Sequence, residues 1–333
     1  MEEKALRLSA VFLMILTAVS FVLLPKLPAL HTWEVEAREE RIAEEEFAQS
    51  QVTMQNLKIK EQNEAAGAKG ELSIRLPEGV TGDQIAVSND YVTQTIRVEI
   101  PQADRTYFDS YPVLGKSDYI DGLSYTRQGE TGVIEVTTNK VYELQTEYDT
   151  QNFYFNFLTP HEVYDKVVVI DAGHGGRAVG ANKQGINEKD IDLAIVLKLK
   201  EIFDNSDQNI GVYYTRTDDS NPTFDQRVQL ANKSDADLFI SIHNNSTRSG
   251  RMSGTSGTQV MYDETSEASR QFAQICLEEV TGRIGSRDKG LVEGDSIYII
   301  RTSEVPVALI EVGFMTNKDE LEKLNSDAYQ RAT

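Results

Sequence analysis

Two of the four histidines in this 333-residue chain follow short apolar runs. His174 comes after the run at residues 167–170 and is followed by two glycines, while His243 comes after residues 238–242 and is followed by two asparagines. Short apolar runs of this kind are typical of buried strands. Ligands of open α/β sheets bind at the carboxyl ends of the strands, so we expect both imidazoles at one binding edge.

Two acidic residues have similar settings. Glu188 follows Asn187, a residue suited to begin a helix, only 14 positions after His174, and Glu311 ends the apolar run 307–310. Zinc hydrolases typically use three protein ligands, often histidines and a carboxylate, and leave one position for water. His174, Glu188 and His243 form such a set. A carboxylate at the end of an apolar strand needs a partner or a function, because burying it alone is costly.

Each of these residues, taken singly, has a simpler interpretation. A lone histidine after a strand is more often a hydrogen-bonded structural residue than a metal ligand. A glutamate in the first turn of a helix, such as Glu188, is favoured by the helix dipole. Glu311 is also a candidate partner for a buried arginine such as Arg216. The residue chemistry alone therefore leaves a metal site and structural roles evenly balanced.

From residue 165 to residue 333, predicted strands alternate with predicted helices. The pattern predicts strands at 167–170, 210–214, 238–242, 258–262 and 307–310, and helices at 187–203, 224–233 and 266–282. Such alternation indicates an α/β domain whose sheet is covered by helices. Residues 71–160 instead alternate apolar and polar residues between turn signals, which predicts a small β-sandwich. That module has no cluster of catalytic side chains, and we expect it to bind or to act as a spacer.

The N-terminal region, residues 1–33, contains an apolar stretch without charge at residues 8–24. As a helix it would be about 26 Å long, slightly less than a bilayer core. We expect an uncleaved membrane anchor with the bulk of the chain outside the cytoplasm; the alternative is a cleaved signal and secretion to the wall. Residues 34–70 predict a charged helical stalk and a linker, and a solvated helix is favoured over a coiled coil because its apolar positions are sparse.

Composition excludes two further classes. The formal net charge is −20 and no basic stripe is present, which argues against a nucleic-acid partner. The single cysteine, Cys276, excludes an intrachain disulfide framework and a CxxC zinc site. It lies on the apolar face of a predicted helix, so we interpret it as a small buried residue.

Residues 165–333 resemble the zinc-dependent N-acetylmuramoyl-L-alanine amidases of bacterial cell walls. The matching motifs lie at residues 168–176, 187–188, 215–218, 236–245 and 306–317. The resemblance implies a mixed α/β sheet flanked by helices, and Zn²⁺ held by His174, Glu188 and His243. It also implies that Glu311 is the catalytic acid/base and that peptidoglycan is the substrate. The implied reaction cuts the amide between the lactyl group of N-acetylmuramic acid and L-alanine.

Some finer expectations follow from the same resemblance. Asn245 and the backbone near Gly175 are weaker candidates for orienting substrate. Residues 246–257 are too short and too rich in glycine and serine to plug the site, so we expect it to be open and to need no activating protein. The family's last helix usually continues beyond the point that matches residues 326–333, which leaves open whether the chain is a fragment.

Two rival functions stay open at this point. One is a non-catalytic, membrane-tethered wall-binding protein that retains the zinc fold, and the other is a zinc peptidase acting on another bond of the stem peptide. The presence of Glu311 argues against the first rival, and the family-specific motifs argue against the second. The β-sandwich resembles, in architecture only, modules that target some of these amidases to the cell envelope.

Overall fold

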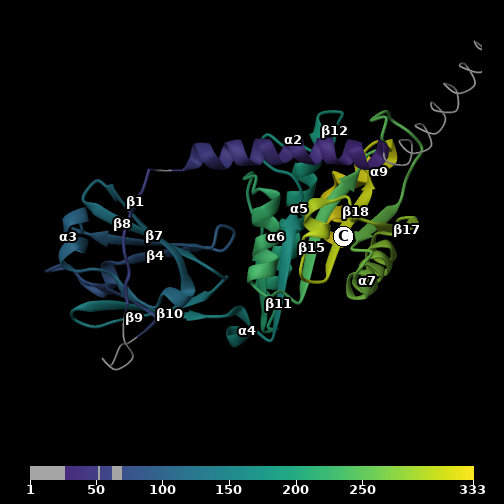
Figure 1. The fold of residues 1–333 in the computed structure, drawn as a ribbon. Coiled ribbons are helices and arrows are strands. Elements are labelled where there is room, and N and C mark those ends of the chain that lie inside the picture. The colour runs from purple at the N-terminus through teal and green to yellow at the C-terminus, as the bar shows by residue number, and fades with distance from the viewer. Residues whose placement is uncertain (1–26, 52, 62–69) are drawn as a thin grey trace, which may run out of the picture.

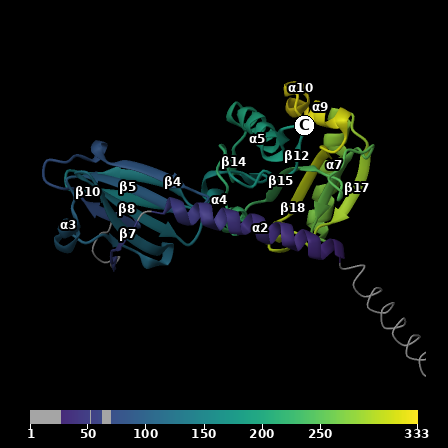
Figure 2. The ribbon, with the colours of Figure 1, turned by 90° about the horizontal axis from the view of Figure 1, so that it is seen from above.

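The computed structural model describes residues 27–51, 53–61 and 70–333. These residues form a β-sandwich, an α/β domain and a long helix, α2 (Leu27–Ser50), which lies across the α/β domain (Figures 1 and 2). In the described part of the chain, no helix is both long and apolar enough to cross a membrane. The predicted membrane span at residues 8–24 lies outside the described residues.

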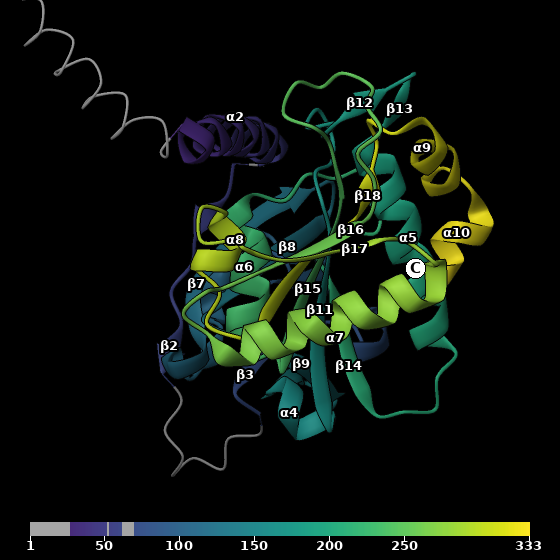
Figure 3. The same cartoon turned by 90° about the vertical axis from the view of Figure 1, so that its right-hand side faces the viewer.

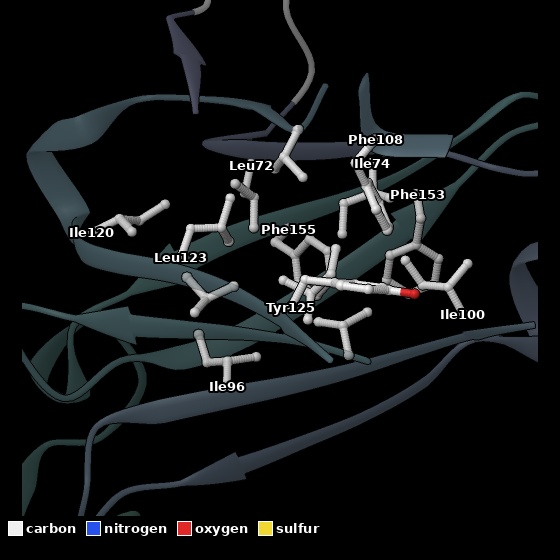
Figure 4. Packing of buried hydrophobic residues seen from close by; sticks show 14 of the residues in the cluster. Leu72, Ile74, Ile96, Ile100, Phe108, Ile120, Leu123, Tyr125, Phe153 and Phe155 are labelled. Carbon is white, nitrogen blue, oxygen red and sulfur yellow. The ribbon is translucent and has the colours of Figure 1, made fainter. Parts of the chain in front are cut away.

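The β-sandwich consists of two five-stranded sheets with a shared core. Alternate side chains of β5 and of β10 are buried, because successive residues of a strand face opposite sides. Ile96 of one sheet and Phe155 of the other both belong to this core, as Figure 4 shows. The first sheet has the order β1 (Gln55–Asn56), β7 (Ile120–Gln128), β8 (Thr131–Thr138), β5 (Thr95–Pro101), β4 (Ala86–Asp90). The second has the order β2 (Lys60–Glu61), β6 (Leu114–Gly115), β3 (Leu72–Arg75), β10 (Asn152–Leu158), β9 (Glu143–Tyr148), and α3 (Arg105–Ser110) lies between β5 and β6 in the chain.

The α/β domain contains a six-stranded mixed sheet. The neighbouring strands β14, β11, β15 and β18 run parallel to one another. Strand β16 is antiparallel to β18, and β17 is parallel to β16. The mixed sheet implied by the resemblance is therefore confirmed. Its order is β14 (Ile210–Tyr214), β11 (Lys166–Ala172), β15 (Leu238–Asn245), β18 (Val307–Phe314), β16 (Thr258–Tyr262), β17 (Asp288–Glu293).

Helices cover both faces of this sheet. One apolar core joins the sheet to α5 (Glu188–Asp204) and α7 (Glu267–Ile284), and another joins its opposite face to α6 (Phe224–Lys233) and α8 (Tyr298–Arg301). In β11, Ile170 belongs to the first core and Val169 to the second, as the alternation of a strand buried on both faces requires. The remaining elements are α4 (Pro160–Val163), the hairpin β12 (Asn182–Lys183) and β13 (Ile186–Asn187), α9 (Lys318–Leu324) and α10 (Asp327–Ala332).

Three of the predicted strands are longer than the sequence pattern indicated, and β11 extends on both sides of the predicted residues 167–170. We expected β15 to end before His243 and β18 to end at Glu311, but both strands continue three residues past those ends, to Asn245 and Phe314. Strand β17 and helix α8 were not predicted at all.

The position of helix α2 differs from the solvated stalk that the sequence predicted. The sequence predicted a solvated stalk, and residues 34–50 are indeed helical, but the helix lies against the α/β domain, on the side of α6 and α8 in Figure 3. Ala43 is buried, and glutamates on the same face accept hydrogen bonds from the domain. The prediction failed because an acidic helix face was taken as a solvent face, whereas its partner surface is itself polar.

Candidate metal and catalytic site

Three neighbouring parallel strands deliver the site to one edge of the sheet. His174 comes two residues after the end of β11, and His243 and Glu311 are direct partners in the ladder between β15 and β18. Parallel strands end at the same edge, so residues distant in the chain meet there. The structure thus brings together both histidines and Glu311 as the apolar runs predicted.

Glu188 reaches the same edge through a short return of the chain. The hairpin of β12 and β13 leads directly into α5, and Glu188 is the first residue of that helix, after Asn187 as its N-terminal cap. The Glu188 Oε1 atom lies 3.0 Å from His174 Nε2 and 3.2 Å from His243 Nδ1. Its Oε2 atom accepts a hydrogen bond from the backbone N–H of Ala181 at 2.7 Å. Glu188 is therefore fixed between the two imidazoles.

These residues fit a metal centre. Possible ligand atoms of His174, Glu188 and His243, together with Asp192, lie within 4.8 Å of one another. Two imidazole nitrogens and a carboxylate oxygen are ligands that zinc commonly takes in catalytic sites. The sequence did not single out Asp192, although its position four residues after Glu188 places both on one face of α5. One Asp192 oxygen accepts a hydrogen bond from Asn244 Nδ2 at 2.7 Å.

The shifted pKa values of the site residues also indicate that positive charge is favoured there. Burial disfavours the charged imidazole of His174, but the carboxylates of Glu188 and Glu39 outweigh burial and raise its pKa well above the ordinary value. Burial would raise the pKa of Glu188, yet the two histidines lower it far below its usual range. Burial and the charge of Glu188 together raise the pKa of Asp192 well above its usual value. Positive charge at this position, from protons or from a metal, is what keeps Glu188 ionised.

Two buried arginines hold the backbone that carries His174. Arg227 donates to the carbonyls of Ala172 and His174 and to the Asp171 carboxylate, at 2.8, 2.6 and 2.6 Å. Arg216 donates to the carbonyls of Ala172 and Gly173 at 2.9 and 2.6 Å. These contacts keep His174 at a φ of +58°, a conformation that residues with a side chain rarely adopt. The loop is thus positioned before any ligand binds.

The glycines of this loop have a packing role. A β-carbon at Gly173 would come within 2.4 Å of the His243 ring, so only glycine leaves room for that histidine. Gly175 has a φ of +139°, and its N–H donates to the carbonyl of Ala178 at 2.9 Å. The N–H of Gly175 is therefore used within a tight turn, and contact of the neighbouring backbone with substrate stays a prediction.

Glu311 is half-buried beside this cluster and is not paired with an arginine. Its Oε2 atom has no hydrogen-bond partner among the described residues. Arg216, the alternative partner considered from the sequence, donates to backbone carbonyls instead, so that alternative is wrong. Burial, with the nearby charge of Glu188, raises the pKa of Glu311 to about 8. A carboxyl group of this kind is poised to exchange a proton.

A cavity of about 690 Å³ opens at this edge, and the two histidines, Glu188 and Glu311 line it. Asn245, a weaker candidate for contacting substrate, also lines the cavity, and its side chain donates to Gln259 at 3.2 Å. Residues 246–257 contain no helix, as expected. Glu36 and Glu39 of α2 also line this cavity, and the expectation that the site is open without an activating protein stays a prediction.

The residues of this site lie in the half of the chain that matches known proteins. The sequence profile of the N-acetylmuramoyl-L-alanine amidase family matches residues 168–333. The uncharacterized protein YqiI of Bacillus subtilis (strain 168) is 38% identical over 172 residues, which cover 50% of this chain and 78% of that protein. This chain belongs to the N-acetylmuramoyl-L-alanine amidase family.

Other similar proteins carry the family name. The N-acetylmuramoyl-L-alanine amidase CwlM of Bacillus licheniformis is 33% identical over 49% of this chain and 62% of its own length. The crystal structure of N-acetylmuramoyl-L-alanine amidase from Clostridium difficile 630 is 33% identical, with a TM-score of 0.48, over 50% of this chain and 89% of that one. In each case the similarity covers about half of this amidase-family chain.

The contacts that support the ligands were missed from the sequence. The sequence did not predict the supporting contacts of Asp171, Arg216 and Arg227, although these residues lie in or near the matching motifs. It placed Glu39 in a solvated helix and not beside the metal site. A buried arginine leaves no periodic signal, because its partners are carbonyls distant in the chain. The one available signal was Asp171 itself, a charge that directly follows a buried strand.

Replacing either histidine of the cluster by alanine should abolish tight metal binding. We expect His174→Ala and His243→Ala to lose bound zinc, because two ligands rarely hold a catalytic zinc ion. His161→Ala is the matched control, since His161 contacts the carbonyl of Asp235 outside the cluster. Metal content after dialysis, measured by atomic emission, tests this; full zinc content in either cluster variant would contradict the assignment.

The Asp171–Arg227 pair should stabilise the fold in a pH-dependent way. Burial opposes ionisation, but Arg227 and the hydroxyls of Ser241 and Thr215 lower the pKa of Asp171 to about 2. Its contribution is present above the unfolded-state pKa of about 4 and is lost as the pH falls through 2. Asp171→Asn should cost about 3–5 kcal/mol at neutral pH, because it breaks a buried pair.

The difference in unfolding free energy between wild type and Asp171→Asn should shrink by about 2 kcal/mol between pH 5 and pH 2. Urea unfolding of the metal-free protein at several pH values measures it. Asp165→Asn, at an exposed position, is the control and should change stability little. A difference that does not vary with pH would contradict this role of Asp171.

Proposed function

We propose that the protein is a zinc-dependent N-acetylmuramoyl-L-alanine amidase, which hydrolyses the amide between N-acetylmuramic acid and L-alanine in peptidoglycan. The observation that supports this best is the cluster of the half-buried His174 and His243 with the buried Glu188, beside which the Oε2 atom of Glu311 has no hydrogen-bond partner, in a chain of this family. A metal held by the first three residues would polarise the amide carbonyl and make water a better nucleophile.

Glu311 would move the proton that the reaction requires. As water adds to the carbonyl carbon, the Glu311 carboxylate takes one of its protons, and it returns that proton to the nitrogen as the carbon–nitrogen bond breaks. Burial supports this role, because a carboxylate removed from water accepts a proton more readily. A cation at the neighbouring ligands would favour the ionised form that begins the cycle.

Other residues would position the substrate and the enzyme. Asn245 lines the cavity beside Glu311 and would contact the substrate through its amide.

The β-sandwich offers no cluster of metal-ligating or acid–base residues among its described residues, and we propose that it contributes localisation and not chemistry. The rival of a non-catalytic wall-binding protein is less well supported, because such a protein would have no need of a Glu311 carboxylate whose shielded Oε2 atom has no hydrogen-bond partner.

We further propose that residues 8–24 anchor the protein in the cell membrane, with its bulk outside the cytoplasm. The uncharged stretch and the location of peptidoglycan support this proposal. Membrane fractions should contain the protein with its N-terminal residues intact. A mature protein that begins near Phe21 would instead indicate a cleaved signal and release to the wall.

Substituting Glu311 by glutamine should separate catalysis from metal binding. The change keeps the size of the side chain but removes the base, so we expect zinc content to stay unchanged. The rate of amide cleavage should fall by about two to four orders of magnitude, the usual contribution of general acid–base catalysis. Mass analysis of muropeptides released from purified peptidoglycan measures the rate and identifies the bond.

Glu304→Gln provides the matched control. Glu304 is exposed and lies just before the start of β18, the strand that carries Glu311. It should keep both zinc and activity. Loss of metal from Glu311→Gln would make Glu311 a ligand, and full activity would remove it from the reaction. Cleavage of a different stem-peptide bond by the wild type would favour the zinc peptidase.

A further inference from the structure

Helix α2 presents one acidic face to the α/β domain. Glu36, Glu39, Glu40, Ala43 and Glu46 recur every three or four residues, so they share a side of the helix. Ala43, in the middle of this face, is 2% exposed, and its small side chain lets the helix approach closely. We call these five residues the docking face.

Both flanks of the docking face accept hydrogen bonds from the domain. Glu40 accepts from the backbone N–H of Phe224 at 2.7 Å, at the first residue of α6, where the helix dipole favours a carboxylate. Glu36 accepts from the N–H of Tyr298 at 2.7 Å. Glu46 accepts from Arg177 Nε and from Asn221 Nδ2, both at 3.0 Å. The helix is therefore held along its length by specific contacts.

The centre of the docking face meets the metal site itself. The Glu39 carboxylate lies 3.2 Å from His174 Nδ1, while Glu188 lies 3.0 Å from Nε2 of the same ring. Glu39 also lines the cavity that contains Glu188 and Glu311. A substrate amide that approaches Glu311 has to enter the space that this helix borders.

We propose that α2 is a built-in inhibitory helix, which covers the site and is fastened to the ligand His174 through Glu39. The enzyme is then inactive while α2 is docked, and it becomes active when the helix leaves. The effect on activity rests on the proposed function; the docking of α2 on His174 does not.

The composition of the contact suits a helix that can leave. Among residues 34–50 only Ala43 is buried, and the larger apolar side chains Val35 and Phe47 are 44% and 39% exposed. Polar contacts between segments of one chain resemble transient interfaces. They differ from the apolar cores inside the β-sandwich and inside the α/β domain. Separation exposes little apolar surface, so α2 can undock without unfolding the domain beneath it.

Docking should also be coupled to metal retention. A histidine that donates its Nδ1 hydrogen to a carboxylate is held with Nε2 available to a metal, and such outer partners raise metal affinity. Glu39 occupies this position on His174. By linkage, a bound metal should strengthen docking and docking should slow metal loss.

The first test compares two arginine substitutions on α2 in the full-length, zinc-loaded protein. Ala43→Arg places a long charged side chain in the centre of the docking face, and Ala48→Arg makes the same change at an exposed position. We expect Ala43→Arg to raise the rate of muropeptide cleavage by about 10- to 100-fold, as release of a mostly closed state would. Ala48→Arg should match the wild type. Equal rates for all three proteins, or a slower rate for a folded Ala43→Arg, would overturn the proposal.

The second test does not depend on substrate. Zinc transfer to a chromogenic chelator should be about 10- to 100-fold faster from Ala43→Arg and from Glu39→Gln than from wild type. Glu44→Gln, an exposed change of the same kind on the same helix, is the control and should not alter the rate. Unchanged zinc transfer from Ala43→Arg and Glu39→Gln would overturn the fastening of α2 to His174.

The third test holds α2 on the domain with a reversible tether. Cysteines at Glu46 and Asn221, whose side chains are hydrogen-bonded, can be joined by a short reducible cross-linker in a Cys276→Ser background. The linked protein should lose activity and regain it on reduction; full activity while linked would overturn the inhibition. If no variant cleaves peptidoglycan, the proposed function fails, but zinc transfer and cross-linking yield still decide whether α2 docks.

Discussion

The burial of Glu188 between two imidazoles is the interaction on which the rest of the site depends. Its carboxylate is 7% exposed and lies within 3.2 Å of nitrogens from His174 and His243. An isolated buried carboxylate is costly, so the arrangement requires positive charge at that point. In the absence of a metal, protons on the imidazoles can supply it, and a divalent cation would supply it more strongly. The site is therefore built around a cation and not around a neutral hydrogen-bond network.

The fold supplies the rigidity that this arrangement needs. His243 and Glu311 are fixed by the ladder of two central parallel strands, whereas His174 stands on a loop after its strand. Two buried arginines, Arg216 and Arg227, hold the carbonyls of that loop. The fold itself therefore positions these side chains, which favours catalysis through preorganised groups.

Much of this site follows from the sequence, because its ligands stand at the ends of apolar runs. His174, His243 and Glu311 could be assigned to one sheet edge from those runs alone, and the first turn of α5 placed Glu188. The supporting contacts of Asp171 with Arg227 join residues 56 positions apart and leave no local pattern. Helix α2 was predicted as a helix but not as a cover, because an acidic face looks the same whether water or a polar protein surface lies opposite.

The central claim is that His174, Glu188 and His243 hold a catalytic zinc ion while Glu311 stays free to move protons. A crystal structure of the zinc-loaded, full-length protein, with anomalous data collected at the zinc absorption edge, tests this most directly. We predict one anomalous peak, about 2.0–2.2 Å from one atom of each of the three ligands, with Glu311 outside that shell. An ion bound elsewhere, or Glu311 among its ligands, would contradict the account.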